Sequence, residues 1–359
     1  MADGRRALVG AGVLAGVAGA AYAAERAVVA GVRRAPDPDA GKPLQPPYDE
    51  TFRFPSHDGG SIFAISRGKG PVLLFCHGVT LSNRVWVKQF ESLPELGFRC
   101  IAYDSRGHGD SATGSSGHSV ENLARDVRTV IEHLHLHEVV LVGHSMGGAA
   151  VQAFVLHHPD VAAARVRGMV LMSTFSRLGL SGSTFLRRLA EQATGRGPAA
   201  NQVMAQPNLG FLLARIGFGR DPQASHVELT REMIVACGAD ESRLAVGTLF
   251  GVDFTDELPH VDLPTLVLSG SADVLAPPAE SRRLATLIPG ARLEVFKGAG
   301  HMLMLERTEE VDALVVEFAK TLGAGSPLRR LWPRRPGRRR ARRRRARAAV
   351  RATAAEPVS

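Results

Sequence analysis

The sequence predicts an α/β fold, in which a mostly parallel β-sheet is covered by helices on both faces. Short β-rich runs alternate with helix-like segments from residue 51 onward. Most of these runs are apolar throughout, which is typical of strands that are buried on both faces. A gap of about 90 residues separates two of the runs, and this gap is too long for a simple crossover.

The predicted strands follow one another in chain order. "TFRFP" at 51 and "SIFAISR" at 61 flank a His-Asp-Gly-Gly turn and are expected to pair as a hairpin. The further runs are "PVLLFC" at 71, "FRCIAYD" at 98, "EVVLVG" at 138, "VRGMVLMS" at 166, "PTLVLSG" at 264 and "ARLEVFKG" at 291. In such a sheet, the chemistry is expected at the carboxyl ends of the strands.

The long gap is predicted to hold a helical cap over the active edge of the sheet. It contains the helical patterns "STFLRRLAEQA", "LGFLLARIGFG" and "VELTREMIVACG". We place the cap at about 175–257, within a domain that spans residues 49–325.

Residues 1–34 contain a weakly hydrophobic segment. Arg5 and Arg6 precede 18 uncharged residues, 7–24. As a helix these would span about 27 Å, close to the ~30 Å hydrocarbon core of a bilayer. We expect membrane association through this anchor. The alternatives are secretion after cleavage of a signal peptide at "AYA", or an Ala/Gly-rich terminus of a cytoplasmic protein. The following residues, 35–48, include five prolines and are predicted to be a linker.

The net charge of +9 comes from residues 326–359. They carry thirteen arginines and one glutamate, a formal charge of +12, which leaves residues 1–325 at −3. Because like charges repel, this tail is expected to be disordered. We expect it to attract an anionic membrane or another polyanion. Trp332 is its only aromatic residue, so no specific nucleic-acid recognition is expected.

The three cysteines, Cys76, Cys100 and Cys237, form no disulfide framework and match no zinc-ligand spacing. If Tyr103 lies opposite Cys76 in the sheet, Cys100 is about 10 Å away along its strand. That separation is too great for a disulfide bridge. We expect buried thiols, with no metal site and no cofactor.

Residues 139–154, "VVLVGHSMGGAAVQAF", read as a strand, a sharp turn and a helix around Ser145. Gly143 and Gly147 complete a G-x-S-x-G pattern with Ser145 at its centre. A serine at the apex of so tight a turn has strained backbone angles, and the two glycines remove side chains that would clash there. The turn would expose the hydroxyl at a helix N-terminus, which favours negative charge. Ser145 is therefore a candidate nucleophile.

A serine nucleophile needs a base and a carboxylate that orients the base. His301, in "FKGAGHMLMLE", follows the last predicted strand in a glycine-rich loop. Asp273, in "PTLVLSGSADVLAPP", lies just past the preceding strand. Asp273 would hold the proton on the far ring nitrogen of His301 and stabilise the imidazolium. The competing position, after the strand that ends near Ser173, offers no carboxylate.

An oxyanion hole is predicted in two turns. The His-Gly turn in "LLFCHGVTLSNRVW" would aim the Val79 N–H at the site, and the Met146 N–H follows the nucleophile. One such donor is typically worth ~3 kcal/mol of transition-state stabilisation. Asp104, Arg106 and His108, in "YDSRGHGDSA", are predicted to tie loops together rather than to act in catalysis.

Together these motifs resemble the α/β-hydrolase superfamily, in its serine esterase/lipase-like branch. "HGVT", "DSRGHGDS", "GHSMGG", "GSADVLAPP" and "GAGH" fall in the family's order over roughly residues 50–322. The resemblance implies an eight-stranded, mostly parallel sheet with a lid after strand six. It also implies a catalytic triad of Ser145, Asp273 and His301 with oxyanion donors Val79 and Met146.

The resemblance implies a serine hydrolase that cleaves carboxylic esters through an acyl-enzyme, either an esterase or an enzyme like a monoacylglycerol lipase. Its substrate would be a small-molecule ester with an apolar acyl group. Epoxide hydrolases and haloalkane dehalogenases are disfavoured, because they have aspartate where this chain has Ser145 and because the cap lacks tyrosine. A cofactor-free perhydrolase like the haloperoxidases, or a C–C bond hydrolase, would use the same triad. A non-catalytic tethering protein that acts through its tail is the remaining alternative.

Apolar cap residues are candidates for an acyl pocket, because a lid faces the nucleophile. We single out Phe211, Leu212, Phe218 and Phe250. The competing expectation is that most apolar cap residues pack the cap onto the core.

Overall fold

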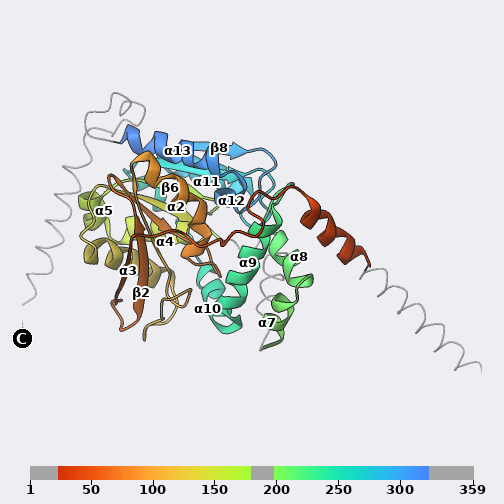
Figure 1. Cartoon of the computed structure of the whole chain (residues 1–359). Coiled ribbons are helices and arrows are strands. Elements are labelled where there is room, and N and C mark those ends of the chain that lie inside the picture. Colours follow the sequence, from red (N-terminus) through yellow and green to blue (C-terminus); the bar gives the residue numbers. More distant parts are fainter. Residues whose placement is uncertain (1–22, 179–197, 323–359) are drawn as a thin grey trace, which may run out of the picture.

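The computed structural model describes residues 23–178 and 198–322, and a single twisted sheet runs through its centre (Figure 1). The strand order is β1-β2-β4-β3-β5-β6-β7-β8. β1 pairs with β2 and β2 with β4 in antiparallel fashion, and all the other neighbours are parallel. Each predicted run forms a strand: β1 (Glu50–Pro55), β2 (Ser61–Arg67), β3 (Val72–Cys76), β4 (Arg99–Tyr103), β5 (Val139–His144), β6 (Val166–Met172), β7 (Thr265–Gly270) and β8 (Arg292–Phe296). The predicted α/β fold class is confirmed.

Successive residues of the central strands point into two different cores. Along β3, Leu73 and Phe75 belong to one hydrophobic cluster, whereas Leu74 and Cys76 belong to the other. The side-chain period of a strand is two residues, so an uninterrupted apolar run supplies both faces of the sheet. This explains why these strands read as continuous apolar segments.

Helices close both cores. α3 (Val120–His133), α4 (Met146–His157) and α11 (Pro278–Leu287) supply one of them, and α2 (Val87–Ser92) and α13 (Thr308–Thr321) supply the other. Residues 146–155 of α4 are all buried, because this helix lies between the sheet and α3. Two short helices, α5 (Pro159–Arg165) and α12 (Leu303–Glu306), lie between α4 and β6 and between β8 and α13.

Between β6 and β7, the described residues 198–264 form four α-helices: α7 (Pro198–Ala205), α8 (Leu209–Arg215), α9 (Ala224–Cys237) and α10 (Ala239–Leu249). They stand together on one side of the sheet, away from α3 and α13 (Figure 1), and we call them the insertion. α8 and α9 occupy two of the helical patterns seen in the sequence. The third pattern, "STFLRRLAEQA", lies outside the described residues.

The N-terminal segment packs against this insertion. Residues 23–34 are helical, and Val29 is buried in the same core as Phe211 of α8. The Arg33 guanidinium lies 5.0 Å from the centroid of the Phe211 ring and donates to the carbonyl of Pro207. The end of this helix therefore contacts α8 and the residues just before it.

The Pro-rich segment 35–48 is more than a spacer, because its acidic residues bind α9. Asp37 accepts hydrogen bonds from the backbone N–H of Ser225 (2.7 Å) and from its hydroxyl (2.9 Å). Ser225 lies in the first turn of α9, where free N–H groups and the helix dipole favour a carboxylate. Periodicity in the sequence gives no sign of such a contact between distant segments.

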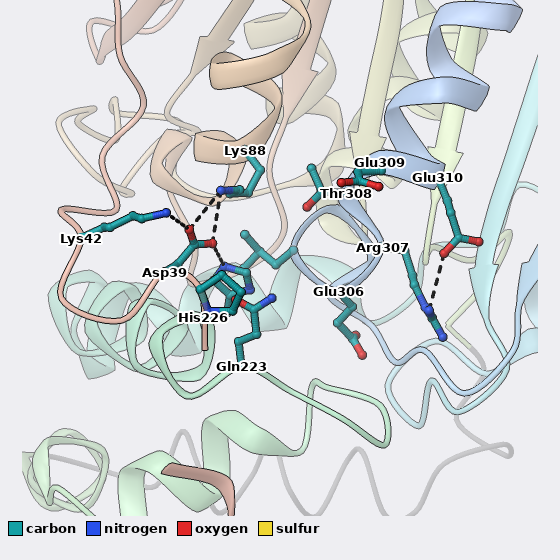
Figure 2. A pocket seen from close by; sticks show the side chains of 12 residues that line it. Asp39, Lys42, Lys88, Gln223, His226, Glu306, Arg307, Thr308, Glu309 and Glu310 are labelled. Carbon is teal, nitrogen blue, oxygen red and sulfur yellow. Dashed lines mark hydrogen bonds and ion pairs between the residues drawn. The ribbon is translucent and has the colours of Figure 1, made fainter. Parts of the chain in front are cut away.

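Asp39 joins three parts of the molecule at one buried carboxylate. It accepts hydrogen bonds from Lys42 (3.1 Å), from Lys88 of α2 (3.3 Å) and from His226 of α9 (3.0 Å), as Figure 2 shows. Burial alone would raise the pKa of Asp39, but these donors lower it to about 2.

Several predictions concern residues that the structure does not describe. The hydrophobic segment is placed only from residue 23 onward, and the arginine-rich tail lies beyond residue 322. Within the described ranges, no helix combines the length and the hydropathy needed to cross a bilayer. Cys76 lies opposite Tyr103, as expected, and the three cysteines are free thiols.

Asp39→Asn is expected to destabilise the protein by about 1–3 kcal/mol at pH 7, because three cationic or polar donors lose a charged acceptor. The pKa of Asp39 is lowered in the folded state, so its contribution is full above the unfolded pKa of about 4. It is lost as the pH falls toward 2. Urea unfolding from pH 7 to pH 3 measures both effects. The exposed Asp262→Asn is the control, and equal losses in the two variants would contradict the role of Asp39.

Candidate active site

Ser145 occupies a strained turn between β5 and α4. Its φ of 51° and ψ of −116° lie in a region that non-glycine residues rarely adopt. A Cβ on Gly143 would lie 2.6 Å from the carbonyl oxygen of Gly147, and a Cβ on Gly147 would lie 2.1 Å from that of Cys76. Only glycine fits at both positions, so the G-x-S-x-G pattern is required by the close approach of the backbones.

The surrounding strands hold this turn in place. The Ser145 N–H donates to the carbonyl of Met172 in β6 (3.0 Å). The Ser145 carbonyl accepts from the N–H of Ala149 (3.1 Å) and from the hydroxyl of Thr174 (2.7 Å). These contacts offset the backbone strain and leave Ser145 7% exposed at the edge of the sheet.

Asp273 and His301 meet in the loops that follow the two last strands. β7 and β8 are parallel neighbours, so their carboxyl-terminal loops lie side by side. The Nδ1–H of His301 donates to Oδ2 of Asp273 over 2.9 Å. The other oxygen, Oδ1, accepts from the N–H groups of Leu275 (2.9 Å) and Ala276 (2.8 Å). The carboxylate is thus fixed by backbone donors and buried, at 3% exposure.

His144, the residue before Ser145, contacts the loop that carries His301. The two imidazole rings lie 4.7 Å apart between centroids, and Nε2–H of His144 donates to the backbone carbonyl of His301 (3.1 Å). Burial lowers the pKa of His144 well below its usual range, so the ring is neutral. The serine turn and the histidine loop are therefore direct neighbours.

The loop after β3 lies against the same turn. A Cβ on Gly78 would come within 3.2 Å of the Ser145 Cβ and 2.8 Å of a ring nitrogen of His144. Val79 follows Gly78, and Met146 begins α4 directly after Ser145. The residues that carry both predicted oxyanion donors thus flank Ser145. β3 and β5 are neighbours in the sheet, but the strands that follow them in the chain, β4 and β6, lie on opposite sides of this pair. In α/β sheets, ligands bind at such a switch point.

These features agree with the outcome of a comparison with known families. The sequence profile of the α/β-hydrolase fold matches residues 71–308. The chain belongs to the α/β-hydrolase family. The resemblance carried by the sequence motifs is confirmed.

Individual relatives of this hydrolase are enzymes. This chain is 32% identical over 274 residues to a non-heme haloperoxidase of Rhodococcus erythropolis. The alignment covers 74% of this chain and 97% of the relative. The chain is 28% identical over 276 residues to a bifunctional esterase/perhydrolase of Acinetobacter calcoaceticus, covering 74% and 98%. Among solved structures, an esterase from Exiguobacterium antarcticum matches with a TM-score of 0.66 at 25% identity, covering 75% of this chain and 98% of that one.

The loop after β4 supports the hydrolase site through hydrogen bonds to neighbouring loops. Asp104 accepts from the backbone N–H (2.6 Å) and the side-chain amide (2.9 Å) of Asn83. Arg106 pairs with Asp126 (2.7 Å), and Nε2 of His108 accepts from the N–H of the residue after Val79 (3.1 Å). Burial lowers the pKa of His108 to about 4, which keeps that nitrogen free to accept.

Three of the four apolar residues predicted to line an acyl pocket are packed into one core. Phe211 and Phe218 are buried with Met302, beside the histidine loop, and Leu212 packs against the same cluster. Phe250 follows α10 and is 38% exposed. The structure therefore brings Phe211, Leu212 and Phe218 together and leaves Phe250 at the surface.

Two residues that the sequence did not single out contribute to this site. His144 links the serine turn to the histidine loop, and Glu306 accepts hydrogen bonds from backbone groups on either side of His301. The only sequence signal was position, because His144 precedes the serine and Glu306 follows the histidine by five residues. Across residues 23–178 and 198–322, no cluster of histidine, cysteine and acidic side chains is arranged to hold a metal ion.

Gly147→Ala is expected to destabilise the protein by about 1–3 kcal/mol, because the new methyl group overlaps the backbone of β3. Gly247→Ala is the matched control. Gly247 is an exposed residue of α10 with no atom within 4 Å of its Cβ position. Its substitution is expected to be neutral or to stabilise by up to about 1 kcal/mol. Thermal or urea unfolding compares the two, and equal stabilities would contradict the tight turn.

Proposed function

We propose that this protein is a serine hydrolase that cleaves the carboxylic esters of small molecules. The hydrogen bond between His301 and Asp273, in a loop that touches the Ser145 turn, carries the proposal. A buried carboxylate that fixes one ring nitrogen of a histidine leaves the other ring nitrogen as a base. Esterases among the structural relatives support the same reaction class.

In the proposed mechanism, the Ser145 hydroxyl attacks the ester carbonyl and gives its proton to Nε2 of His301. The oxyanion of the tetrahedral intermediate accepts hydrogen bonds from the N–H groups of Val79 and Met146. The intermediate collapses to an acyl-enzyme, and the leaving alcohol takes the proton from His301. Water then attacks with the same base and releases the acid. Asp273 keeps its hydrogen bond to His301 and stabilises the transient imidazolium.

Perhydrolysis is a second candidate reaction for the same acyl-enzyme. It is favoured by the similarity to a non-heme haloperoxidase and to a bifunctional esterase/perhydrolase. In this reaction, hydrogen peroxide replaces water as the attacking nucleophile and the product is a peracid. The same serine, base and oxyanion donors serve both reactions, so the two differ only in the partition of the acyl-enzyme.

The apolar acyl group of the proposed substrate remains a prediction from the sequence, because Phe211, Leu212 and Phe218 pack into the core. Membrane association through the N-terminus and attraction of the arginine-rich tail to polyanions remain predictions from the sequence.

Ser145→Ala is expected to abolish hydrolysis of p-nitrophenyl esters, and Asp273→Asn to lower kcat by about 10³- to 10⁴-fold with the fold intact. The measurement is steady-state kinetics over acyl chains of increasing length. Asp262→Asn, an exposed carboxylate, is the control and should retain wild-type activity. Full activity in Ser145→Ala would rule out the proposed nucleophile.

If perhydrolysis is the main reaction, peroxide in acetate buffer will yield peracetic acid at a rate that exceeds acetate-ester hydrolysis. The Ser145→Ala variant should lose both reactions together, because they share one acyl-enzyme. Peracid formation that persists in this variant would remove the second candidate.

A further inference from the structure

Glu306 folds back from the end of α12 onto the loop that carries His301. Its carboxylate accepts from the N–H of Gly300 (3.0 and 3.1 Å) and from the N–H of Met302 (3.2 Å). These two residues flank His301 on either side. Glu306 therefore holds the backbone of the histidine loop without touching the imidazole–carboxylate pair itself.

The same carboxylate reaches the insertion. Its Oε2 accepts from the N–H of Gly219, in the loop after α8, over 2.7 Å. Two backbone hydrogen bonds run beside it, from the N–H of His301 to the carbonyl of Gly217 (2.8 Å) and from the N–H of Arg220 to the carbonyl of Gly298 (3.0 Å). The 217–220 loop and the histidine loop are thus joined, and Glu306 binds both.

This junction requires close contact of the two backbones. A Cβ on Gly219 would lie 2.1 Å from the carbonyl oxygen of Gly298, and a Cβ on Gly300 would lie 2.4 Å from the nitrogen of Gly219. Glycines at these positions let the two loops approach so closely that the Glu306 carboxylate accepts hydrogen bonds from N–H groups of both. A longer separation would leave buried donors unpaired, which is costly.

Charged groups on both sides face Glu306. Arg215 of α8 donates to the carbonyls of Phe218 (2.9 Å) and Arg220 (3.3 Å), and its positive charge attracts Glu306. Asp273 opposes the negative charge of Glu306 from the β7 loop. Burial raises the pKa of Glu306, although its backbone donors act in the opposite direction.

Glu306 also lines a cavity of about 440 Å³, whose wall includes residues of the 38–42 segment, of the start of α9 and of the 305–310 segment (Figure 2). The neighbouring Arg307 lines the same cavity and pairs with Glu310 (3.5 Å). Glu309 lines the same cavity as an exposed side chain. Glu309 is therefore a matched control, an acidic residue at the same cavity with no hydrogen bond to the histidine loop.

We propose that Glu306 is a positioning residue that fixes the His301 backbone and couples it to the 217–220 loop of the insertion. The proposal rests on the proposed function, because His301 matters only as the base of Ser145. A carboxylate that binds three backbone donors restrains the loop from both sides of the histidine. Loss of that restraint displaces the base from the serine, and a displacement of 1 Å can cost about a hundredfold in rate.

Glu306→Gln tests the proposal, because it keeps the shape of the side chain but replaces one acceptor oxygen with an amide donor. We expect kcat for p-nitrophenyl esters to fall about 10- to 100-fold, with KM changed less than about threefold. The acidic limb of the kcat/KM profile should also move to lower pH, because a negative charge near the protonated base is removed. Glu309→Gln removes the same charge and should leave both measurements unchanged.

Glu306→Asp separates the effect of side-chain length from the effect of the negative charge. This variant also provides the test if Glu306→Gln does not fold. The aspartate is one methylene shorter, so kcat should fall similarly while the acidic limb stays in place. If the folded variants have a kcat within about twofold of wild type and the acidic limb does not shift, the proposal is overturned.

Hydrogen exchange distinguishes a failure of the Glu306 proposal from a failure of the proposed function. The amides of Gly219, Gly300 and Met302 should exchange faster in Glu306→Gln than in wild type, whether or not the enzyme turns over an ester. Unchanged exchange would overturn the clamp. A wild type that cleaves no ester and takes no fluorophosphonate label, yet shows the faster exchange in the variant, would count against the proposed function alone.

Discussion

The strained turn at Ser145 is the constraint on which the rest of the site depends. A non-glycine residue with φ of 51° persists only when its surroundings hold it there. Three parallel strands supply that support: the carbonyl of Cys76 in β3 leaves room only for glycine at 147, β5 ends in the turn, and Met172 of β6 accepts its N–H. The position of the serine is therefore a property of the centre of the sheet.

The histidine loop is the second rigid element, and it is restrained from several directions. Asp273 binds the imidazole, His144 binds the backbone carbonyl, and Gly217 accepts the backbone N–H. The insertion is in turn held by the N-terminal segment through Asp37 and its neighbours. Contacts thus run without a break from the N-terminal segment, through α9 and the 217–220 loop, to the base.

The sequence predicted the sheet well, and the positions of the three candidate site residues in the fold have the same physical reason. Strands buried on both faces read as continuous apolar runs, and residues directly after parallel strands fall at one edge of the sheet. Ser145, Asp273 and His301 all have that position. Loop-to-loop contacts have no such periodic signature. The binding of Asp37 to α9 and of Glu306 to Gly219 joins residues 188 and 87 positions apart, and only the folded chain brings them together.

The most direct measurement is the location of the acyl group during turnover. Wild-type protein is mixed with a p-nitrophenyl ester, quenched in acid within the burst phase, digested and analysed by peptide mass spectrometry. We expect one peptide, which contains Ser145, to carry the mass of the acyl group, and the label to disappear as the substrate is exhausted. Turnover with the acyl group on another residue, or with no acylated peptide at early times, would contradict a mechanism through Ser145.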